Sequence, residues 1–214
     1  MEAKENSFES VVSGEMELVI PFFQRAYVWE NEHWNRFFDD LFASFENNKE
    51  HFLGSIILKR SQSGNNFSSV IDGQQRLTTF SILLKVLYDN IDEANRKYFN
   101  NCLFKKYTDN VPKIKHSKLD RNVYQNLFLE KPIIDINTEK GICGCYNFFK
   151  RKIDKIGNKE KIYNFMKSIN DSKIWVAVHL NANEDEQKIF DSINSTGEPL
   201  GVADIVKNAL FDKA

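Results

Sequence analysis

Apolar side chains recur every three or four residues along two stretches of the chain, and this spacing predicts two amphipathic helices. The first, residues 30–47, opens with the polar run Glu30-Asn31-Glu32, which suits a helix N-terminus. The second covers residues 74–90. Between them, the apolar runs 52–60 and 67–72 flank a Ser/Gly/Asn-rich turn at 61–66 and predict a β-hairpin. The apolar positions are Trp34, Phe37, Phe38, Leu41, Phe42 and Phe45 in the first helix, and Leu77, Phe80, Leu83, Leu84, Leu87 and Tyr88 in the second.

The remaining segments complete an α+β layout. We expect a short helix or strand at 8–13, an extended segment at 17–20, and a mostly helical region over 94–170 that Pro112, Pro132 and Gly141 interrupt. A final strand at 173–180 precedes helices at 184–193 and 202–212.

Four hydrogen-bonding side chains crowd the corner between the predicted strand 67–72 and the helix that follows it. They belong to the run Asp72-Gly73-Gln74-Gln75-Arg76. Unpaired N–H groups and the positive end of the helix dipole suit a phosphate, and a guanidinium beside them adds bidentate anion recognition. Gly73 permits a tight turn or close approach of a ligand to the backbone. The alternative is an ordinary turn with a polar cap and solvated side chains.

A second polar pair, Gln24-Arg25, lies inside the otherwise apolar and aromatic segment 20–29. Pro21 favours extended backbone at Ile20 and argues against a helix here. An Arg among apolar neighbours most often pairs with a carboxylate or a phosphate. The structural alternative is an ion pair between Arg25 and an acid such as Asp39 or Asp40.

A third polar corner follows the predicted helix 184–193. Asn194 or Gly197 suits a left-handed helix-terminating position, and the hydroxyls of Ser195 and Thr196 suit a ribose or phosphate. Asp204 and Lys207 lie one turn apart on the next helix. From these residues alone, a helix cap and a structural ion pair are the favoured interpretation.

Composition narrows the class of protein. A net charge of −1 excludes a globally basic nucleic-acid binder, so any DNA contact is local, in lysine-rich zones such as 105–121 and 150–155. These zones also carry acids, which favours solvated faces. Three cysteines without paired C-x-x-C spacing favour a reduced, cytoplasmic chain. The four histidines form no i, i+4 pair, so we expect no histidine-based metal site. No apolar run reaches transmembrane length, so we expect no membrane-spanning helix. No G-x-x-x-x-G-K-[ST] run is present, which excludes an ordinary P-loop enzyme.

Three motifs in order resemble the N-terminal domain of GmrSD-type, modification-dependent restriction enzymes and related anti-phage defence proteins. They are the segments 20–29, Phe52-Leu53-Gly54-Ser55-Ile56 and 72–79. The stretch 189–200 with Asp204 and Lys207 also fits, and 117–127 is similar to the family's variable helical insert. The resemblance spans residues 8–212 and implies a ParB/sulfiredoxin-like small mixed sheet with flanking helices and a helical insert. We expect a core over 1–93, an insert over 94–170 and closing elements over 171–214.

The resemblance implies binding and Mg²⁺-dependent hydrolysis of a nucleoside triphosphate of unknown base. Asp72 would hold the metal or orient the attacking water, Gln74 or Gln75 would position that water, and Arg76 would bind phosphate. Asp72, Gln75 and Arg76 are the expected catalytic residues. The resemblance also changes the interpretation of the third polar corner, residues 194–207. It implies that this stretch closes over the same nucleotide pocket and is not only a helix cap with a structural ion pair. The nucleotide-binding residues expected on this basis are Gln24, Arg25, Gly73, Gln74, Thr78, Thr79, Asn194, Thr196, Gly197, Asp204 and Lys207.

Related proteins often continue into an H-N-H-type nuclease domain, whereas this sequence ends at Ala214 without such a cluster. We therefore expect either an excised domain or a partner nuclease chain. The first hypothesis is an NTP-hydrolysing regulatory or sensor module that controls DNA cleavage in a restriction system. The second is a non-catalytic module for modified DNA, in which Tyr27, Trp29 and Trp34 stack on an exposed base. The third is a nuclease site at Asp72 itself. Homo-oligomerisation is left open, and no membrane partner is expected.

Overall fold

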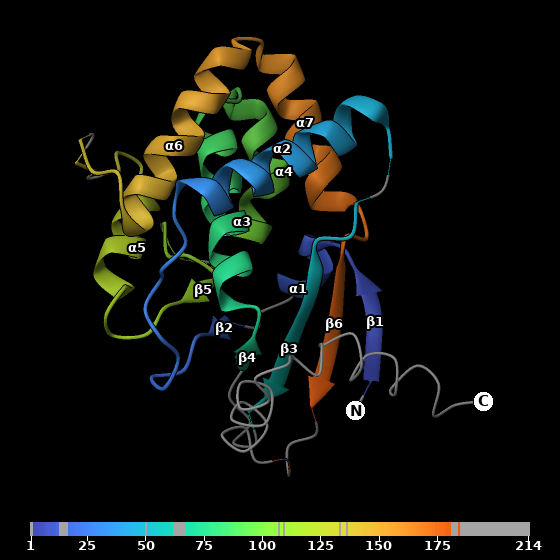
Figure 1. Ribbon diagram of the computed structural model, residues 1–214, viewed down its shortest axis with the longest axis vertical. Helices are drawn as coiled ribbons and strands as arrows, with labels where there is room; N and C mark the ends of the chain where they lie inside the picture. Colours follow the sequence, from blue (N-terminus) through green and yellow to red (C-terminus); the bar gives the residue numbers. More distant parts are fainter. Residues whose placement is uncertain are drawn as a thin grey trace.

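A computed structural model describes most of the chain: residues 2–12, 17–49, 51–61, 67–106, 108, 110–132, 134–135, 137–180 and 184. Figure 1 shows helices gathered on one side of a mixed β-sheet, with α3 in their midst. Among the described residues, the helices are α1 (Phe8–Val12), α2 (Asn31–Asn47), α3 (Gln74–Asp89), α4 (Glu93–Leu103), α5 (Arg121–Leu127), α6 (Gly141–Ile156) and α7 (Lys159–Asp171). The α+β prediction is confirmed.

The described sheet has six strands in the order β1-β6-β3-β4-β2-β5. Three pairs are parallel (β6 with β3, β4 with β2, β2 with β5) and two are antiparallel (β1 with β6, β3 with β4), so the sheet is mixed. The strands are β1 (Glu2–Asn6), β2 (Glu17–Val19), β3 (Gly54–Arg60), β4 (Phe67–Asp72), β5 (Ile114–Lys115) and β6 (Trp175–Leu180). β3 and β4 form the predicted hairpin, which brings the start of β3 beside the end of β4.

Helix α3 is buried on nearly every side. It packs against α4, α6 and α7, and its polar residues Thr78, Thr79, Ser81 and Lys85 are buried together with its apolar ones. The aromatic rings of Phe80 and Trp175 meet edge to face with centroids 5.3 Å apart, which joins the helix to the sheet. Amphipathic spacing predicts a single buried side, so the sequence interpretation of α3 was incomplete. The surrounding helices supply the rest of its cover.

Strand β4 contains a β-bulge just before the candidate site. Leu58 pairs with Val70 and Ile57 with Asp72, which leaves Ile71 as an extra residue in β4. Val70 belongs to the main core, whereas Ile71 packs with Ile57, Val178 and Leu180 in a separate cluster. Such bulges bend a strand and redirect its next side chain. Here that side chain is Asp72.

Several predicted boundaries differ from the structure. The strands predicted from residues 52 and 173 begin at Gly54 and Trp175, and the mostly helical region includes β5. β1 was missed because its sequence, Glu-Ala-Lys-Glu-Asn, is largely polar and lacks apolar alternation. It is a strand because all of its residues pair with β6, from Trp175 to His179. The helices predicted at 184–193 and 202–212 lie outside the described residues, apart from Glu184. The three-part domain division and the ParB/sulfiredoxin likeness remain predictions.

Candidate functional site

The two polar motifs, 46 or more residues apart in sequence, line one cavity. Its volume is about 360 Å³, and its wall combines the segment 23–25 with the run 72–76 at the start of α3. Trp29 completes the lining. The prediction that Gln24 and Arg25 lie beside the Asp72–Arg76 corner therefore matches their placement in the structure.

The start of α3 is open to a ligand. Gly73 precedes the helix at φ 89°, in the left-handed region, and in the described part of the chain no side-chain hydrogen bond caps the first turn. A Cβ at Gly73 would lie 2.7 Å from Ile56 Cγ2 and 3.1 Å from the Ser55 carbonyl oxygen, so glycine is required both for the backbone angle and for the close approach to β3. Unsatisfied N–H groups at such a terminus favour an anion.

Arg76 is held over a second glycine. Its Nη2 donates to the Ser55 carbonyl at 2.8 Å and lies 3.8 Å from Asp72 Oδ2, and its side chain is 30% exposed. Gly54, at φ 130°, lies directly beneath the guanidinium, because a Cβ there would be 2.4 Å from Arg76 Nη1. The loose ion pair and the partial exposure leave donors of Arg76 available to a phosphate.

The three glutamines have a different arrangement from the one the sequence suggested. Gln75 Oε1 accepts from the Val28 N–H at 3.0 Å while its Nε2 donates to the Ala26 carbonyl at 3.1 Å. Gln74 Nε2 donates to the Arg25 carbonyl at 3.1 Å, and Gln24 Nε2 donates to the Ile71 carbonyl at 2.7 Å. These amides bind backbone, so they fix the loop 21–30 against α3 and β4. The cationic groups of the cavity are then Arg25 and Arg76.

Arg25 is exposed, and within the described chain its guanidinium has no ion pair or side-chain hydrogen bond. The alternative in which Arg25 pairs with Asp39 or Asp40 is wrong in this structure: Asp39 pairs with Lys152 at 3.1 Å, and Asp40 lies 3.9 Å from His51. Among the residues that the structure describes, Arg25 is therefore an unpaired cation at the cavity.

The loop 21–30 is also anchored from beneath by Tyr27. The buried Tyr27 hydroxyl accepts from Trp34 Nε1 at 2.8 Å and lies 2.6 Å from Thr79 Oγ1. Burial raises the pKa of Tyr27 well above its usual value, so this phenol stays neutral and hydrogen-bonded. The main-chain N–H of Tyr27 donates to Asp120 Oδ2 at 2.9 Å. Asp120 precedes α5, and no local pattern pointed to this role.

Thr78 and Thr79, predicted to bind nucleotide, face the interior instead of the cavity. Thr78 Oγ1 lies 3.1 Å from His116 Nε2, and Thr79 Oγ1 donates to the Gln75 carbonyl at 2.8 Å. Burial lowers the pKa of His116 to about 3, so the imidazole is neutral at ordinary pH. The other predicted nucleotide-binding residues, Asn194, Thr196, Gly197, Asp204 and Lys207, lie outside the described residues.

Asp72 is the carboxylate lining this cavity, and it is 32% exposed. Among the described residues, no group of three or more His, Cys, Asp or Glu side chains is arranged to hold a metal ion. One carboxylate fits Mg²⁺ that arrives with substrate phosphate oxygens, because Mg²⁺ commonly uses one or two protein carboxylates there. Among the described residues, the further acids that the third hypothesis, a nuclease site at Asp72, would need do not line this cavity.

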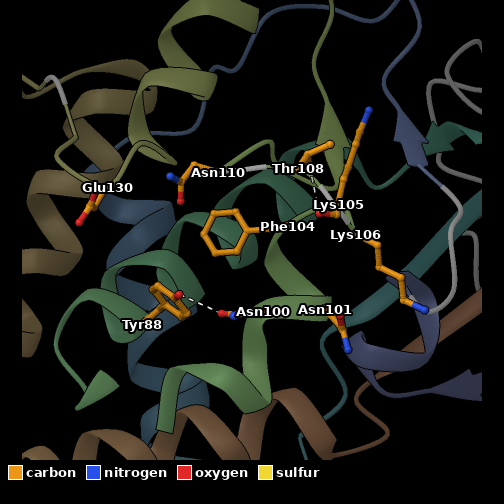
Figure 2. Close-up of a pocket in the computed structure, with 9 residues that line it drawn as sticks. All are labelled: Tyr88, Asn100, Asn101, Phe104, Lys105, Lys106, Thr108, Asn110 and Glu130. Carbon is orange, nitrogen blue, oxygen red and sulfur yellow. Dashed lines mark hydrogen bonds between the residues drawn. The ribbon is translucent and has the colours of Figure 1, made fainter. Parts of the chain in front are cut away.

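A larger cavity, about 700 Å³, lies elsewhere and is shown in Figure 2. Its lining includes Phe104, Lys105 and Lys106 and none of the motif residues. Lys105 Nζ already pairs with Glu17 Oε1 at 2.7 Å, and the Tyr88 hydroxyl donates to Asn100. Lys106 and Glu130 also line this cavity, but the run 72–76 and the segment 23–25 line the smaller one, which we take as the candidate site.

Comparison with known proteins identifies the family. Residues 7–211 match the family model described as GmrSD restriction endonuclease, N-terminal domain. The chain belongs to this family. The resemblance seen in the motifs is thereby confirmed over nearly the whole chain. A search of curated proteins found no match.

Family membership supports a role for this GmrSD-type domain in a restriction system, and hence in antiviral defence. It associates the chain with restriction enzymes, which are hydrolases, and suggests DNA interaction and a nuclease partner domain. In the described part of the chain, no helix is long and apolar enough to cross a membrane.

Proposed function

We propose that this domain binds and hydrolyses a nucleoside triphosphate, and that the nucleotide state regulates DNA cleavage by a nuclease domain or chain. The observation that carries the proposal is the convergence of Arg25, Arg76, Asp72 and the uncapped start of α3 on one cavity. Two cations and a helix N-terminus offset the charge of a triphosphate, which is the main requirement of phosphoryl transfer.

The residues divide the work as follows. Arg76, oriented by the Ser55 carbonyl, binds the phosphate that carries developing charge, and the unpaired Arg25 binds from the facing loop. Asp72 orients the attacking water. It is also the residue that would hold Mg²⁺ arriving with the nucleotide, and that ion would supply neutralisation of phosphate charge. The water oxygen bonds to the γ-phosphorus and the bond from that phosphorus to the β,γ-bridging oxygen breaks. The diphosphate nucleotide leaves with that oxygen, one water proton passes to solvent, and the other stays on the phosphate that forms.

The DNA-recognition alternative has less support from the structure than the sequence suggested. Of the three aromatic residues expected to stack on a base, Trp34 and Tyr27 are buried and hydrogen-bonded to each other. Trp29 is the partly exposed one. A base flipped out of DNA would therefore meet one of these rings at most.

The test is release of phosphate from ATP, GTP, CTP and UTP with Mg²⁺. We expect turnover with at least one nucleotide, and loss of that turnover in Asp72→Ala and Arg76→Ala. Both side chains are about one-third exposed, so we expect each variant to melt within a few degrees of the parent. Arg151→Ala, which removes an exposed arginine from α6, is the matched control and should keep full activity. Equal turnover in Arg76→Ala and the control would refute the proposal.

A further inference from the structure

A second cavity adjoins the candidate site. It also has a volume of about 360 Å³, and it shares two lining residues, Trp29 and Arg76, with the first. Its other walls come from α2 and from the segment that leads into β3, including Asp40, His51 and Phe52. Because the same two side chains line both cavities, the cavities are adjacent at Trp29 and Arg76, and we treat them together as one depression with two halves.

The two halves of this depression differ in chemistry. The first half holds Arg25, Asp72 and the start of α3, which suit phosphates. The second half combines aromatic rings with an ion pair between Arg36 and Asp40 at 3.8 Å. The ring of Trp29 stacks on His33 at 5.4 Å and 20°, which fixes its orientation. Phe52 is 63% exposed, although a ring of this size normally gains stability from burial. A polar edge is present as well, where His51 Nε2 lies 3.9 Å from Asp40 Oδ2.

The volume of the first cavity also indicates that a nucleotide would extend beyond it. Pockets that enclose small ligands usually have volumes of roughly 300–1,000 Å³, so the first cavity alone is near the lower limit. A nucleoside triphosphate is elongated, with a charged end and a flat heterocyclic end. A ligand whose phosphates lie beside Arg76 would extend naturally into the second cavity, because Arg76 lines both.

We propose that the second cavity is the nucleobase subsite, in which the base of the bound nucleotide lies against Phe52 and Trp29. Asp40 and His51 lie where they meet the polar edge of the base. This inference rests on the proposed function, since it places the other end of the same ligand. Stacking on an aromatic ring is tolerant of base identity, whereas the polar edge provides the means of discrimination.

The experiment compares two ligands on the full chain with Mg²⁺: inorganic tripolyphosphate, and the β,γ-methylene analogues of the four nucleoside triphosphates. Tripolyphosphate reports the phosphate half alone, because it has no base. We expect Phe52→Ala to raise the Kd of the tightest-binding analogue roughly tenfold and to leave the Kd of tripolyphosphate unchanged. Phe52→Tyr, which keeps the ring, should bind both ligands as the parent does.

Leu119→Ala is the matched control, since Leu119 is a large apolar side chain that is 75% exposed away from both cavities. Unchanged analogue affinity in Phe52→Ala, or an equal loss for both ligands, would overturn the base subsite alone. If the parent chain binds neither tripolyphosphate nor any analogue, the proposed function itself fails and the subsite with it. Melting curves of each variant establish that the comparison is made on folded protein.

Discussion

Gln75 offers the sharpest test of how the site is built. Its amide makes two hydrogen bonds to the backbone of the facing loop, one to the Val28 N–H and one to the Ala26 carbonyl, and the residue is only 8% exposed. The sequence suggested that this side chain positions the attacking water. The structure engages it instead as a clamp on the loop that carries Arg25. The two roles predict different behaviour when the amide is removed.

The replacement Gln75→Met keeps a side chain of similar length and removes both hydrogen bonds. Each such bond contributes about 0.5–1.5 kcal/mol net, so the pair contributes about 1–3 kcal/mol to the free energy of unfolding. For a chain of this size, that loss lowers the Tm by roughly 2–4 °C per kcal/mol. Turnover should fall with it, because the loop that holds Arg25 is no longer fixed against α3.

The assay is denaturant unfolding together with steady-state turnover of Gln75→Met, with Gln125→Met as the control at an exposed glutamine of α5. A lower unfolding midpoint with a raised KM fits the clamp. Loss of turnover with an unchanged midpoint would refute the clamp and return Gln75 to the direct catalytic role. Identical stability and turnover in the parent and the variant would exclude both roles.

Three further changes probe the supports of the site. Gly54→Ala should displace the guanidinium of Arg76 and strain the backbone. We expect the free energy of unfolding to fall by about 1–3 kcal/mol and the Kd for tripolyphosphate to rise about tenfold. Unaltered affinity for tripolyphosphate, measured by calorimetry, would contradict this. Asp120→Ala should cost about 1–3 kcal/mol in denaturant unfolding by freeing the Tyr27 N–H, and Asp120→Asn, which keeps an acceptor, should cost less; equal losses would remove this anchor. The folded pKa of His116, about 3, lies below the unfolded value of about 6.5, so the unfolded chain takes up the proton first. As the pH falls from about 6.5 to about 3, the free energy of unfolding should therefore decrease by up to about 1.4 kcal/mol per pH unit. The Tm should decrease less over this range in His116→Gln, and equal slopes of Tm against pH would contradict the burial of a neutral imidazole.

Much of the architecture follows from local pattern. The periodicity of α2 and α3 and the hairpin of β3 and β4 were predictable because each element hides an apolar face that repeats in sequence. Strand β1 was not predictable in this way, because its polar residues are held by backbone pairing with β6, a partner about 170 residues away. Pairing energy of this kind leaves no trace in the hydrophobic pattern of the strand itself.

For the candidate site, the sequence by itself determined the chemistry at hand: a strand, a glycine, and a helix start with Asp72 and Arg76 adjacent. Asp72 and Arg76 are close together because they are only four residues apart in the chain, so their proximity could be predicted without the tertiary structure. Only the tertiary structure decided which polar groups remain available. It turned the glutamine amides toward loop carbonyls, left Arg25 unpaired, and brought Phe52 and Trp29 to one depression. The reason is that a polar side chain beside the core must satisfy its hydrogen bonds with whatever backbone the fold places within reach, and that choice depends on contacts far apart in sequence.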